Sequence, residues 1–303
     1  MRAALGKWVD GFLPMLQFVM PDEQFVAWPD PEPAPALVVL PDDWDEVPAA
    51  ITDEVRWVHV LAAGVDKFPL ELVGDRLLTC SRGASSPAIA EFVLATMLAF
   101  EKQLPEAWVQ EPPAHWNLMG LGGLRGKTLG LVGVGAIGTE VARRALAFDM
   151  EVLALRRTAG PMPLPGMQRA ESLPELLGRS DHVVVAAPAT PATHHLIDAR
   201  AFDAMKDGAH LVNVARGTLV DQDALRVALD TGRVARASLD VVEPEPLPAG
   251  HWLYTHSKVR LSPHVSWSSP GTIDRTIELF ADNLRRWREG RPLEGLVDVA
   301  AGY

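Results

Sequence analysis

The chain has 303 residues, 48% hydrophobic and 22% charged, a composition typical of globular proteins and unlike disordered or collagen-like chains. Its 28 lysines and arginines are outnumbered by 39 aspartates and glutamates, and the net charge of -11 argues against sequence-independent nucleic-acid binding, which needs clustered basic charge. The length suggests about two domains, and the single cysteine, Cys80, excludes an intramolecular disulfide and a cysteine-based zinc site.

The first twenty residues carry Lys7, Asp10 and Pro14 and lack a clean apolar core followed by a cleavage site, so we expect no secretory signal peptide. This absence and the cysteine usage favour a cytoplasmic protein. The longest apolar run, Pro87 to Phe100, contains Glu91 and is shorter than the ~20 residues that a membrane span needs. We therefore expect a buried helix there and no membrane partner.

The first third of the chain predicts short buried strands. Apolar runs at 36–40, 56–61 and 76–79 are bounded by turn residues, as is typical of parallel strands. The segment 27–35 is rich in proline and acid and is expected to be a surface loop. Ser86-Pro87 then opens a helix that is apolar nearly all round, which is typical of a helix buried between domains or subunits.

From Lys127 onward, strands alternate regularly with helices. Strands are expected at 128–134, 151–155, 182–187, 209–214, 237–242 and 259–261, and helices at 137–148, 199–205 and 221–229, with a last long helix from Thr272. Ser172 and Glu175 form a capping-box pattern before a further short helix. Such alternation predicts right-handed βαβ units and an α/β fold with a doubly wound parallel sheet.

A glycine motif stands between the first strand and helix of this regular part. Gly133, Gly135 and Gly138 match G-x-G-x-x-G, and Ala136 and Ile137 complete the segment. The first glycine permits the tight turn, the second lets the backbone approach a pyrophosphate, and the third lets helix and strand pack closely. We therefore expect these five residues to bind the phosphates of a dinucleotide.

The end of the next strand distinguishes NAD from NADP. NAD sites place Asp or Glu about 20 residues after the motif, where it accepts from the ribose 2′-hydroxyl. Here Arg156, Arg157 and Thr158 follow the strand instead. Arginine binds a 2′-phosphate that a carboxylate would repel, so the sequence predicts NADP(H) as the preferred cofactor, with NAD(H) as the alternative.

Several motifs in one order resemble the D-isomer-specific 2-hydroxyacid dehydrogenases. They are Leu124-Arg125-Gly126-Lys127-Thr128, the glycine motif, Asn213-Val214-Ala215-Arg216-Gly217, Leu239-Asp240-Val241, Glu245-Pro246 and Ser262-Pro263-His264. The resemblance runs from about Arg56 to Gly290 and is weak over the first 35 residues. Its specificity comes from the number and order of the motifs.

The resemblance implies two Rossmann-like doubly wound domains, with the cofactor domain inserted into the substrate domain. A flavodoxin-like substrate domain would comprise 1–87 and 271–303, and a dinucleotide-binding Rossmann domain 88–270. Segments near 88–104 and 264–284 would connect the two. The family usually forms homodimers through the cofactor domain.

The resemblance also implies three catalytic roles. Arg216 matches the arginine that holds the substrate carboxylate and keto oxygen, a task that suits a fixed bidentate cation. His264 matches the acid/base histidine, and Glu245 the carboxylate that stabilises its imidazolium form. Glu243 competes with Glu245 in sequence, but the glutamate directly before Pro246 matches the motif.

Further positions follow from the same alignment. The resemblance assigns Asp240 to the nicotinamide carboxamide, Val214 and Ala215 to the cofactor side of their motif, Pro188 and Thr193 to the loop over the adenosine and phosphates, and Ala63 and Gly64 to the substrate carboxylate. Trp267 either borders the substrate pocket or packs between the domains. His194, His195, His251 and His256 are expected at the surface, with no metal site.

The sequence therefore favours an NADP-dependent oxidoreductase that reduces 2-keto acids to D-2-hydroxy acids, with glyoxylate or hydroxypyruvate as the best substrates. Two alternatives stay open. One is a non-enzymatic dinucleotide-binding protein like the corepressor branch of this superfamily, and the other is a phosphoglycerate or phosphite dehydrogenase of the same fold. Glu245, where formate dehydrogenases carry glutamine, argues against formate as the substrate.

Overall fold

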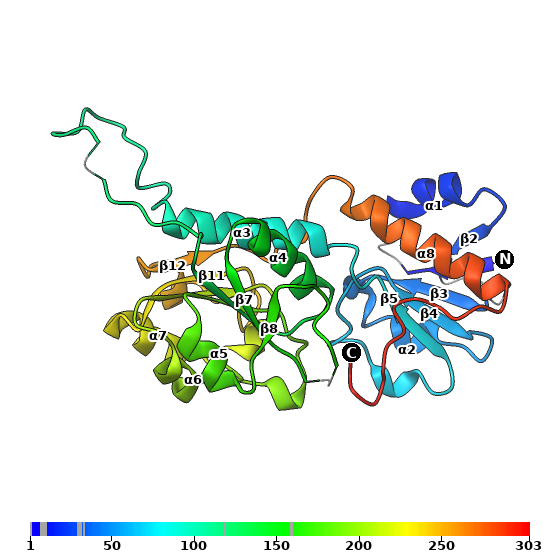
Figure 1. The fold of residues 1–303 in the computed structure, drawn as a ribbon. Helices are drawn as coiled ribbons and strands as arrows, with labels where there is room; N and C mark the ends of the chain where they lie inside the picture. The colour runs from blue at the N-terminus through cyan, green and yellow to red at the C-terminus, as the bar shows by residue number, and fades with distance from the viewer. Residues whose placement is uncertain (1, 7–10, 29–31, 33, 118, 158–159) are drawn as a thin grey trace. The chain divides into compact units, whose positions relative to one another are not determined.

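The structure, a computed structural model, describes residues 2–6, 11–28, 32, 34–117, 119–157 and 160–303. It divides into two compact units (Figure 1). Unit 1 comprises Met1–Ser85 and Ser269–Tyr303, and unit 2 comprises Ser86–Ser268. Unit 1 is therefore built from both ends of the chain, and unit 2 is one continuous segment between them.

Unit 1 contains a five-stranded sheet in the order β2-β1-β3-β4-β5, and all of its strand pairs are parallel. The strands are β1 (Arg2–Leu5), β2 (Gln24–Ala27), β3 (Ala36–Val39), β4 (Trp57–Val60) and β5 (Leu77–Cys80), and the helices are α1 (Leu13–Val19), α2 (Val47–Ala50) and α8 (Thr272–Arg288). The strand order is that of flavodoxin-like doubly wound sheets.

Adjacent residues of β3 bury side chains on opposite faces of this sheet. Val38 belongs to a core with Leu16 of α1 and Phe280 of α8. Leu37 belongs to a second core, with Val47 of α2. Because successive strand side chains point to opposite faces, a strand covered on both sides must be apolar throughout. This requirement explains the continuous apolar run in the sequence.

Unit 2 contains a seven-stranded sheet in the order β12-β11-β10-β9-β6-β7-β8, again with only parallel pairs. The strands are β6 (Thr128–Val132), β7 (Glu151–Leu155), β8 (Met167–Arg169), β9 (His182–Val185), β10 (Ala209–Asn213), β11 (Val234–Leu239) and β12 (Val259–Leu261). Its helices are α3 (Ser86–Glu101), α4 (Ala136–Ala147), α5 (Leu173–Arg179), α6 (Ala199–Ala204) and α7 (Gln222–Thr231). Numbered from β6, the order is that of the Rossmann fold with one strand added, and the direction of winding changes between β6 and β9.

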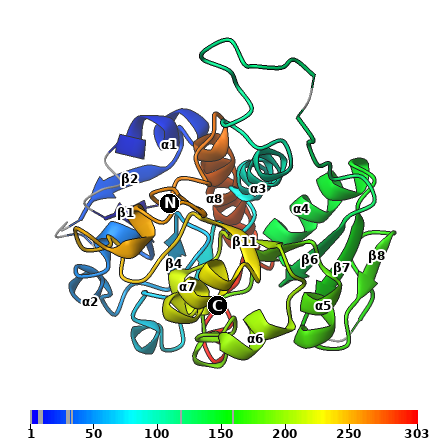
Figure 2. The same ribbon diagram turned by 90° about the vertical axis from the view of Figure 1, so that its left-hand side faces the viewer.

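Two cores cover the two faces of the unit 2 sheet. Val184 of β9 packs with Val93 of α3 and Val141 of α4. Its neighbour Val183 packs with Leu176 of α5 and Leu225 of α7. Figure 2 shows α4 and α5 on opposite sides of the strands. The predicted fold class, two doubly wound parallel α/β sheets, is confirmed.

Several expected elements have different bounds in the structure. The strand expected at 237–242 is β11, Val234–Leu239, because the chain turns out of the sheet at Asp240. Three short strands, β1, β2 and β8, and helix α1 were not predicted; each strand has only three or four residues. Within the expected surface loop 27–35, Ala27 ends β2 and Ala34 is buried.

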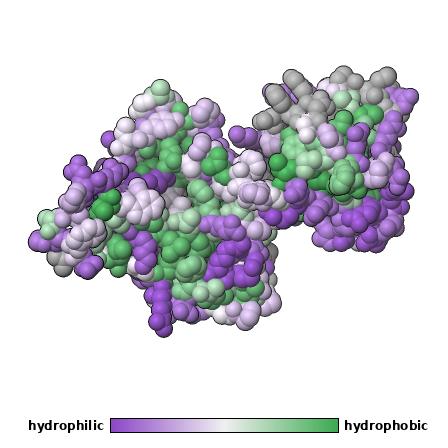
Figure 3. Space-filling model, turned by 90° about the horizontal axis from the view of Figure 1, so that it is seen from above, coloured by the Kyte–Doolittle hydropathy of each residue, from purple (hydrophilic) through white to green (hydrophobic). Residues whose placement is uncertain are grey.

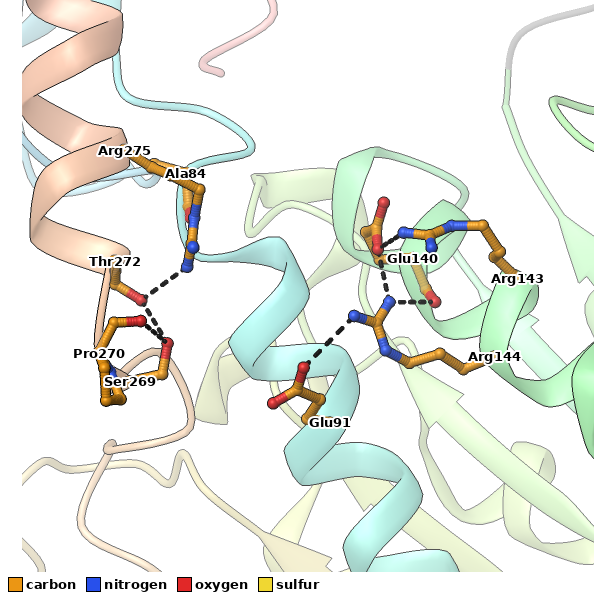
Figure 4. A network of polar contacts seen from close by, with 9 residues as sticks. All are labelled: Ala84, Glu91, Glu140, Arg143, Arg144, Ser269, Pro270, Thr272 and Arg275. Carbon is orange, nitrogen blue, oxygen red and sulfur yellow. Dashed lines mark hydrogen bonds and ion pairs between the residues drawn. The ribbon is translucent and has the colours of Figure 1, made fainter.

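Charged side chains connect neighbouring segments within each unit (Figure 4). In unit 2, Arg144 of α4 forms ion pairs with Glu140 on the same helix and, at 3.5 Å, with Glu91 of α3. In unit 1, Arg275 of α8 donates to the carbonyl oxygen of Ala84 at 2.7 Å. Within the described ranges, the longest helices lack the length and apolar character that crossing a bilayer requires.

Candidate active site

The glycine motif forms the turn between β6 and α4. Gly133 has a φ of +102°, and a Cβ there would lie 2.7 Å from the backbone nitrogen of Ala187. A Cβ on Gly138 would lie 2.4 Å from the carbonyl oxygen of Gly133. Neither position tolerates a side chain. A Cβ on Gly135, in contrast, would meet no atom within 4 Å, so a ligand can approach the backbone there.

The same turn presents the N-terminus of α4. Gly135 is the N-cap residue and provides no side-chain hydrogen bond, and the first turn of the helix contains no acidic residue. The amides at the start of a helix lack intrahelical partners, and the helix dipole favours negative charge beside them. Ala136 and Ile137 belong to this first turn. The residues of the motif therefore fit the pyrophosphate of a dinucleotide.

Arginines stand where β7 ends. Arg156 is half-buried and donates to the carbonyl oxygen of Pro161 at 2.9 Å, and Arg157 is exposed. Arg169 of β8, which sequence reasoning missed, donates to the carbonyl oxygen of Arg156 at 3.3 Å. Thr158 lies outside the described residues. Positively charged side chains thus lie together where β7 and β8 end, on the strands that follow the glycine motif in the chain.

The loop after β9 brings Pro188 and Thr193 together. The Thr193 hydroxyl donates to the carbonyl oxygen of Pro188 at 2.7 Å and accepts from the backbone N–H of Thr190 at 2.8 Å. The hydroxyl thus closes the loop on itself. Any contribution of Thr193 to cofactor binding stays a prediction.

His264 and Glu245 form a hydrogen-bonded pair. His264 Nδ1 lies 3.0 Å from Glu245 Oε2, and the other carboxylate oxygen accepts from the backbone N–H of Val242, also at 3.0 Å. An ionised carboxylate can only accept, so Nδ1 carries the proton and Nε2 faces away from Glu245, available to a ligand.

The environment of Glu245 favours its ionised form. Burial raises the pKa of the carboxyl, but the hydrogen bonds from His264 and Val242 and the positive charges of His264 and Arg216 outweigh burial, so the pKa lies below its usual value. A glutamate ionised at neutral pH stabilises a protonated histidine beside it. The pair can therefore hold a proton at His264 for transfer.

Asp240 positions the loop that carries His264. Its side chain is buried, and its carboxylate accepts three hydrogen bonds: from the Ser262 hydroxyl at 2.6 Å, the Val265 N–H at 2.9 Å and the Ser266 N–H at 2.9 Å. The backbone N–H of His264 donates to the Asp240 carbonyl oxygen at 2.8 Å. These contacts hold the backbone of His264, whose φ is +54°. The nicotinamide contact expected of Asp240 stays a prediction.

Arg216 lies at the end of β10, in a turn that Asn213 organises. Asn213 is fully buried; its amide donates to the Arg216 carbonyl oxygen at 2.9 Å, and its oxygen accepts from the Ala215 N–H at 3.1 Å. Val214 and Ala215 are buried between them. Arg216 Nη1 donates to the Ala215 carbonyl oxygen at 2.7 Å. Asn213 is thus a positioning residue that sequence reasoning missed, although it opens a motif that was singled out.

Three further residues were predicted for the site: Trp267 in unit 2, and Ala63 and Gly64 in unit 1. Trp267 is 45% exposed, and its indole Nε1–H donates to the His264 carbonyl oxygen at 2.9 Å, so it packs over the histidine loop. Ala63 and Gly64 follow β4 in unit 1, where Ala63 is exposed. Their roles toward substrate stay predictions.

Comparison with known proteins decides the family. A model described as "D-isomer specific 2-hydroxyacid dehydrogenase, NAD binding domain" matches residues 94–266, over half of the chain. The chain belongs to this family. It is accordingly an oxidoreductase with a dinucleotide-binding domain.

Individual members of this dehydrogenase family resemble the chain along most of its length. A glyoxylate reductase of Thermofilum pendens is 35% identical over 84% of this chain and 79% of its own. A D-3-phosphoglycerate dehydrogenase of Methanocaldococcus jannaschii is 31% identical over 82% of this chain but only 48% of its own. A solved D-isomer specific 2-hydroxyacid dehydrogenase from Xanthobacter autotrophicus Py2, in complex with NADPH and MES, has a TM-score of 0.88 at 28% identity and covers 100% of this chain and 99% of that one.

Two of the histidines expected at the surface lie side by side there. The sequence predicts His194 and His195 as surface residues and predicts no metal site, and both side chains are exposed in the structure. In the structure their imidazoles stack with ring centroids 4.0 Å apart, and both lie close to the carboxylate of Glu243. The sequence could not indicate this, because neighbouring side chains usually diverge, whereas His195 has a φ of +48°.

The Asp240 contacts predict a specific effect of Asp240→Asn. An amide replaces one acceptor oxygen by an NH₂ group, which would face an N–H or O–H donor inside the protein and leave it without an acceptor. We expect the free energy of unfolding to fall by about 1–3 kcal/mol, as measured by urea denaturation. Ser262→Ala removes one donor without placing two donors against each other, so it should lower the free energy of unfolding by less. A wild-type stability combined with weakened NADPH binding would instead place the role of Asp240 at the nicotinamide.

Proposed function

We propose that this dehydrogenase reduces 2-keto acids to D-2-hydroxy acids with NADPH, and that glyoxylate or hydroxypyruvate is its substrate. The observation that carries the proposal is the hydrogen bond between His264 Nδ1 and Glu245 Oε2, 3.0 Å long, in the same unit as Arg216. An acid/base histidine, a carboxylate hydrogen-bonded to it and a guanidinium are the groups that reduction of a keto acid needs.

Each residue has a separate task in this reaction. Bound NADPH supplies a hydride. The Arg216 guanidinium holds the substrate carboxylate and polarises the keto oxygen through paired N–H donors. His264 donates the proton on Nε2 to that oxygen, and Glu245 stabilises the imidazolium before transfer.

The substrate proposal rests on the relatives and on the residues beside His264. The glyoxylate reductase of T. pendens supports a small 2-keto acid. Trp267 packs over the histidine loop with its ring half-exposed, and an indole there would favour a small or apolar substituent. The similarity to a D-3-phosphoglycerate dehydrogenase supports the second candidate, oxidation of a phosphorylated hydroxy acid.

Turnover with free keto acids tests the function directly. We expect NADPH oxidation, followed by the loss of its absorbance, to vary along a panel from glyoxylate through hydroxypyruvate and pyruvate to phenylpyruvate. His264→Ala should lower turnover by ~100-fold or more, because it removes the proton donor, and should leave NADPH binding intact.

Other results would change the function assigned to the protein. A fully active His264→Ala protein would remove His264 from the mechanism. NADPH binding without turnover of any keto acid would favour the corepressor-like alternative, and activity confined to 3-phosphoglycerate or to phosphite would favour those dehydrogenases.

The preference for NADPH is proposed from the arginines after β7. Arg156 and Arg157 stand where an NAD site would carry an acid, and the X. autotrophicus relative was solved with NADPH. Arg156→Asp would replace an attraction for the 2′-phosphate by a repulsion. We expect the KM for NADPH to rise by at least roughly tenfold, equivalent to about 1.4 kcal/mol, while the KM for NADH changes little. Unchanged NADPH kinetics would show that Arg156 does not bind the 2′-phosphate.

We propose that two copies associate through the segment 102–123, of which the structure describes 102–117 and 119–123. This segment leaves α3 and extends away from the other elements of unit 2 (Figure 1). Its base is closed by hydrogen bonds from Lys102 Nζ to the Gly122 carbonyl oxygen at 2.6 Å and from Gln103 Nε2 to the Gly120 carbonyl oxygen at 3.2 Å. Large apolar side chains are exposed along it: Trp108, Val109, Trp116, Met119 and Leu121. Apolar surface is also visible on unit 2 in Figure 3.

An exposed apolar segment of this kind marks an interaction surface, and the homodimers of the family make a second copy the expected partner. Light scattering should report a dimer, and replacing Trp108 and Trp116 together by serine should shift the population toward monomer. Phe18→Ser is the matched control, because Phe18 is 87% exposed on α1 of unit 1. A monomeric wild-type protein, or a dimer insensitive to both tryptophans, would contradict this proposal.

A further inference from the structure

A second group of side chains with metal-ligating atoms lies in unit 2. It consists of His194, His195 and Glu243, and one ligand atom from each lies within 4.8 Å of the other two. The imidazole centroids are 4.0 Å apart and the rings are inclined by 25°. The three side chains come from two segments more than forty residues apart, so the fold, not the sequence, brings them together.

The backbone of His195 is held in this arrangement. His195 has a φ of +48°, which turns its side chain to the same side as that of His194. Its N–H donates to the Thr218 carbonyl oxygen at 2.8 Å, and the next residue but one, Ile197, donates to the Leu219 carbonyl oxygen at 2.9 Å. These hydrogen bonds hold the backbone next to the imidazoles and do not use the ring nitrogens.

The backbone of Glu243 is held independently by Gln222, the first residue of α7. The Glu243 N–H donates to Gln222 Oε1 at 3.3 Å, and Gln222 Nε2 donates to the Glu243 carbonyl oxygen. The Gln222 carboxamide thus forms hydrogen bonds with both the N–H and the carbonyl oxygen of Glu243. The Glu243 carboxylate reaches toward the imidazoles without disturbing this pairing.

The local charge favours a cation. Asp221, the N-cap of α7, uses Oδ1 for the N–H groups of Asp223 and Ala224. Its second oxygen, Oδ2, lies 3.9 Å from His195 Nδ1. A positive ion bound among the three side chains would therefore contact the Glu243 carboxylate directly. The Asp221 carboxylate would lie behind His195, outside the ion's own ligands.

We propose that His194, His195 and Glu243 bind one Zn²⁺ ion. Two imidazole nitrogens and a carboxylate oxygen are ligands that zinc accepts, and three protein ligands leave one tetrahedral position for water. Imidazole ligands also suit Co²⁺ and Ni²⁺, whereas Mg²⁺ and Ca²⁺ prefer all-oxygen sites. Asp221 would act as a second carboxylate that orients His195.

The proposed ion would link two segments of unit 2. It would join the loop 188–195 to the segment 242–245, which ends at Glu245, but it uses neither His264 nor Glu245. Its expected effects are therefore on metal content and on the thermal stability of unit 2, and these are measurable without substrate or cofactor.

The full-length protein, stripped with chelator and dialysed, would be titrated with Zn²⁺ in competition with a chromophoric indicator. We expect one ion per chain and a rise in Tm on binding. His195→Gln and Glu243→Gln should each weaken binding by at least ~10-fold, because loss even of a second-shell partner costs about 10–100-fold. Both side chains reach the surface, so the variants should fold, which circular dichroism checks.

His256→Gln is the matched control. His256 also lies beside a carboxylate, with Nε2 3.2 Å from Asp230 Oδ1, but belongs to no group of three ligands among the described residues. Its replacement should leave Zn²⁺ affinity unchanged. Visible absorption of the Co²⁺ form should report low-symmetry four- or five-coordination with nitrogen and oxygen ligands, and this spectrum should disappear in Glu243→Gln.

Three results would overturn the proposal. The first is a protein that binds no Zn²⁺. The second is an affinity that survives both His195→Gln and Glu243→Gln. The third is binding lost only in His264→Ala, which would place the ion on the His264–Glu245 pair.

Discussion

The candidate site depends on one buried carboxylate, that of Asp240. Its three accepted hydrogen bonds come from side-chain and backbone donors between Ser262 and Ser266, and its own carbonyl oxygen accepts from His264. A buried charge is tolerated only when its acceptor capacity is filled. The same contacts that satisfy the charge therefore determine where His264 stands and allow its left-handed backbone conformation.

The fold was largely predictable from the sequence because both sheets are covered on both faces. A strand such as β3 is then apolar throughout and lies between prolines, Pro35 and Pro41, so it stands out in the sequence. β1, β2 and β8 did not, because polar residues interrupt their apolar pattern: Arg2 in β1, Gln24 in β2, and Gln168 and Arg169 in β8. The end of β11 was misplaced for a different reason: Val241 and Val242 continue an apolar run, but the side-chain contacts of Asp240 turn the chain out of the sheet.

For the candidate site, the motifs identified residues, and the structure shows the contacts that position them. His264, Glu245 and Arg216 were expected from the resemblance, and the 3.0 Å contact between the first two is consistent with their expected roles. The function of Asn213 could not be predicted, because it depends on a side chain folding back onto its own turn. The cluster of His194, His195 and Glu243 could not be predicted either, because it requires a left-handed residue and the approach of two distant segments.

One close approach connects the Arg216 turn to the segment of the His264–Glu245 pair. A Cβ on Gly217 would lie 2.0 Å from the carbonyl carbon of Val242, so the Arg216 turn touches the segment that leads to Glu245. Gln222, five residues beyond that glycine, holds Glu243 through both of its backbone groups. Glu245 in turn accepts from the Val242 N–H. Backbone contacts therefore connect the Arg216 turn, the start of α7 and the Glu245 carboxylate. In an acidic chain, this framework places the Arg216 guanidinium near the Glu245 carboxylate, whose pKa it helps to lower. A glycine at 217 is thus a requirement of the candidate site itself, because any side chain there would separate Arg216 from the segment that carries Glu245.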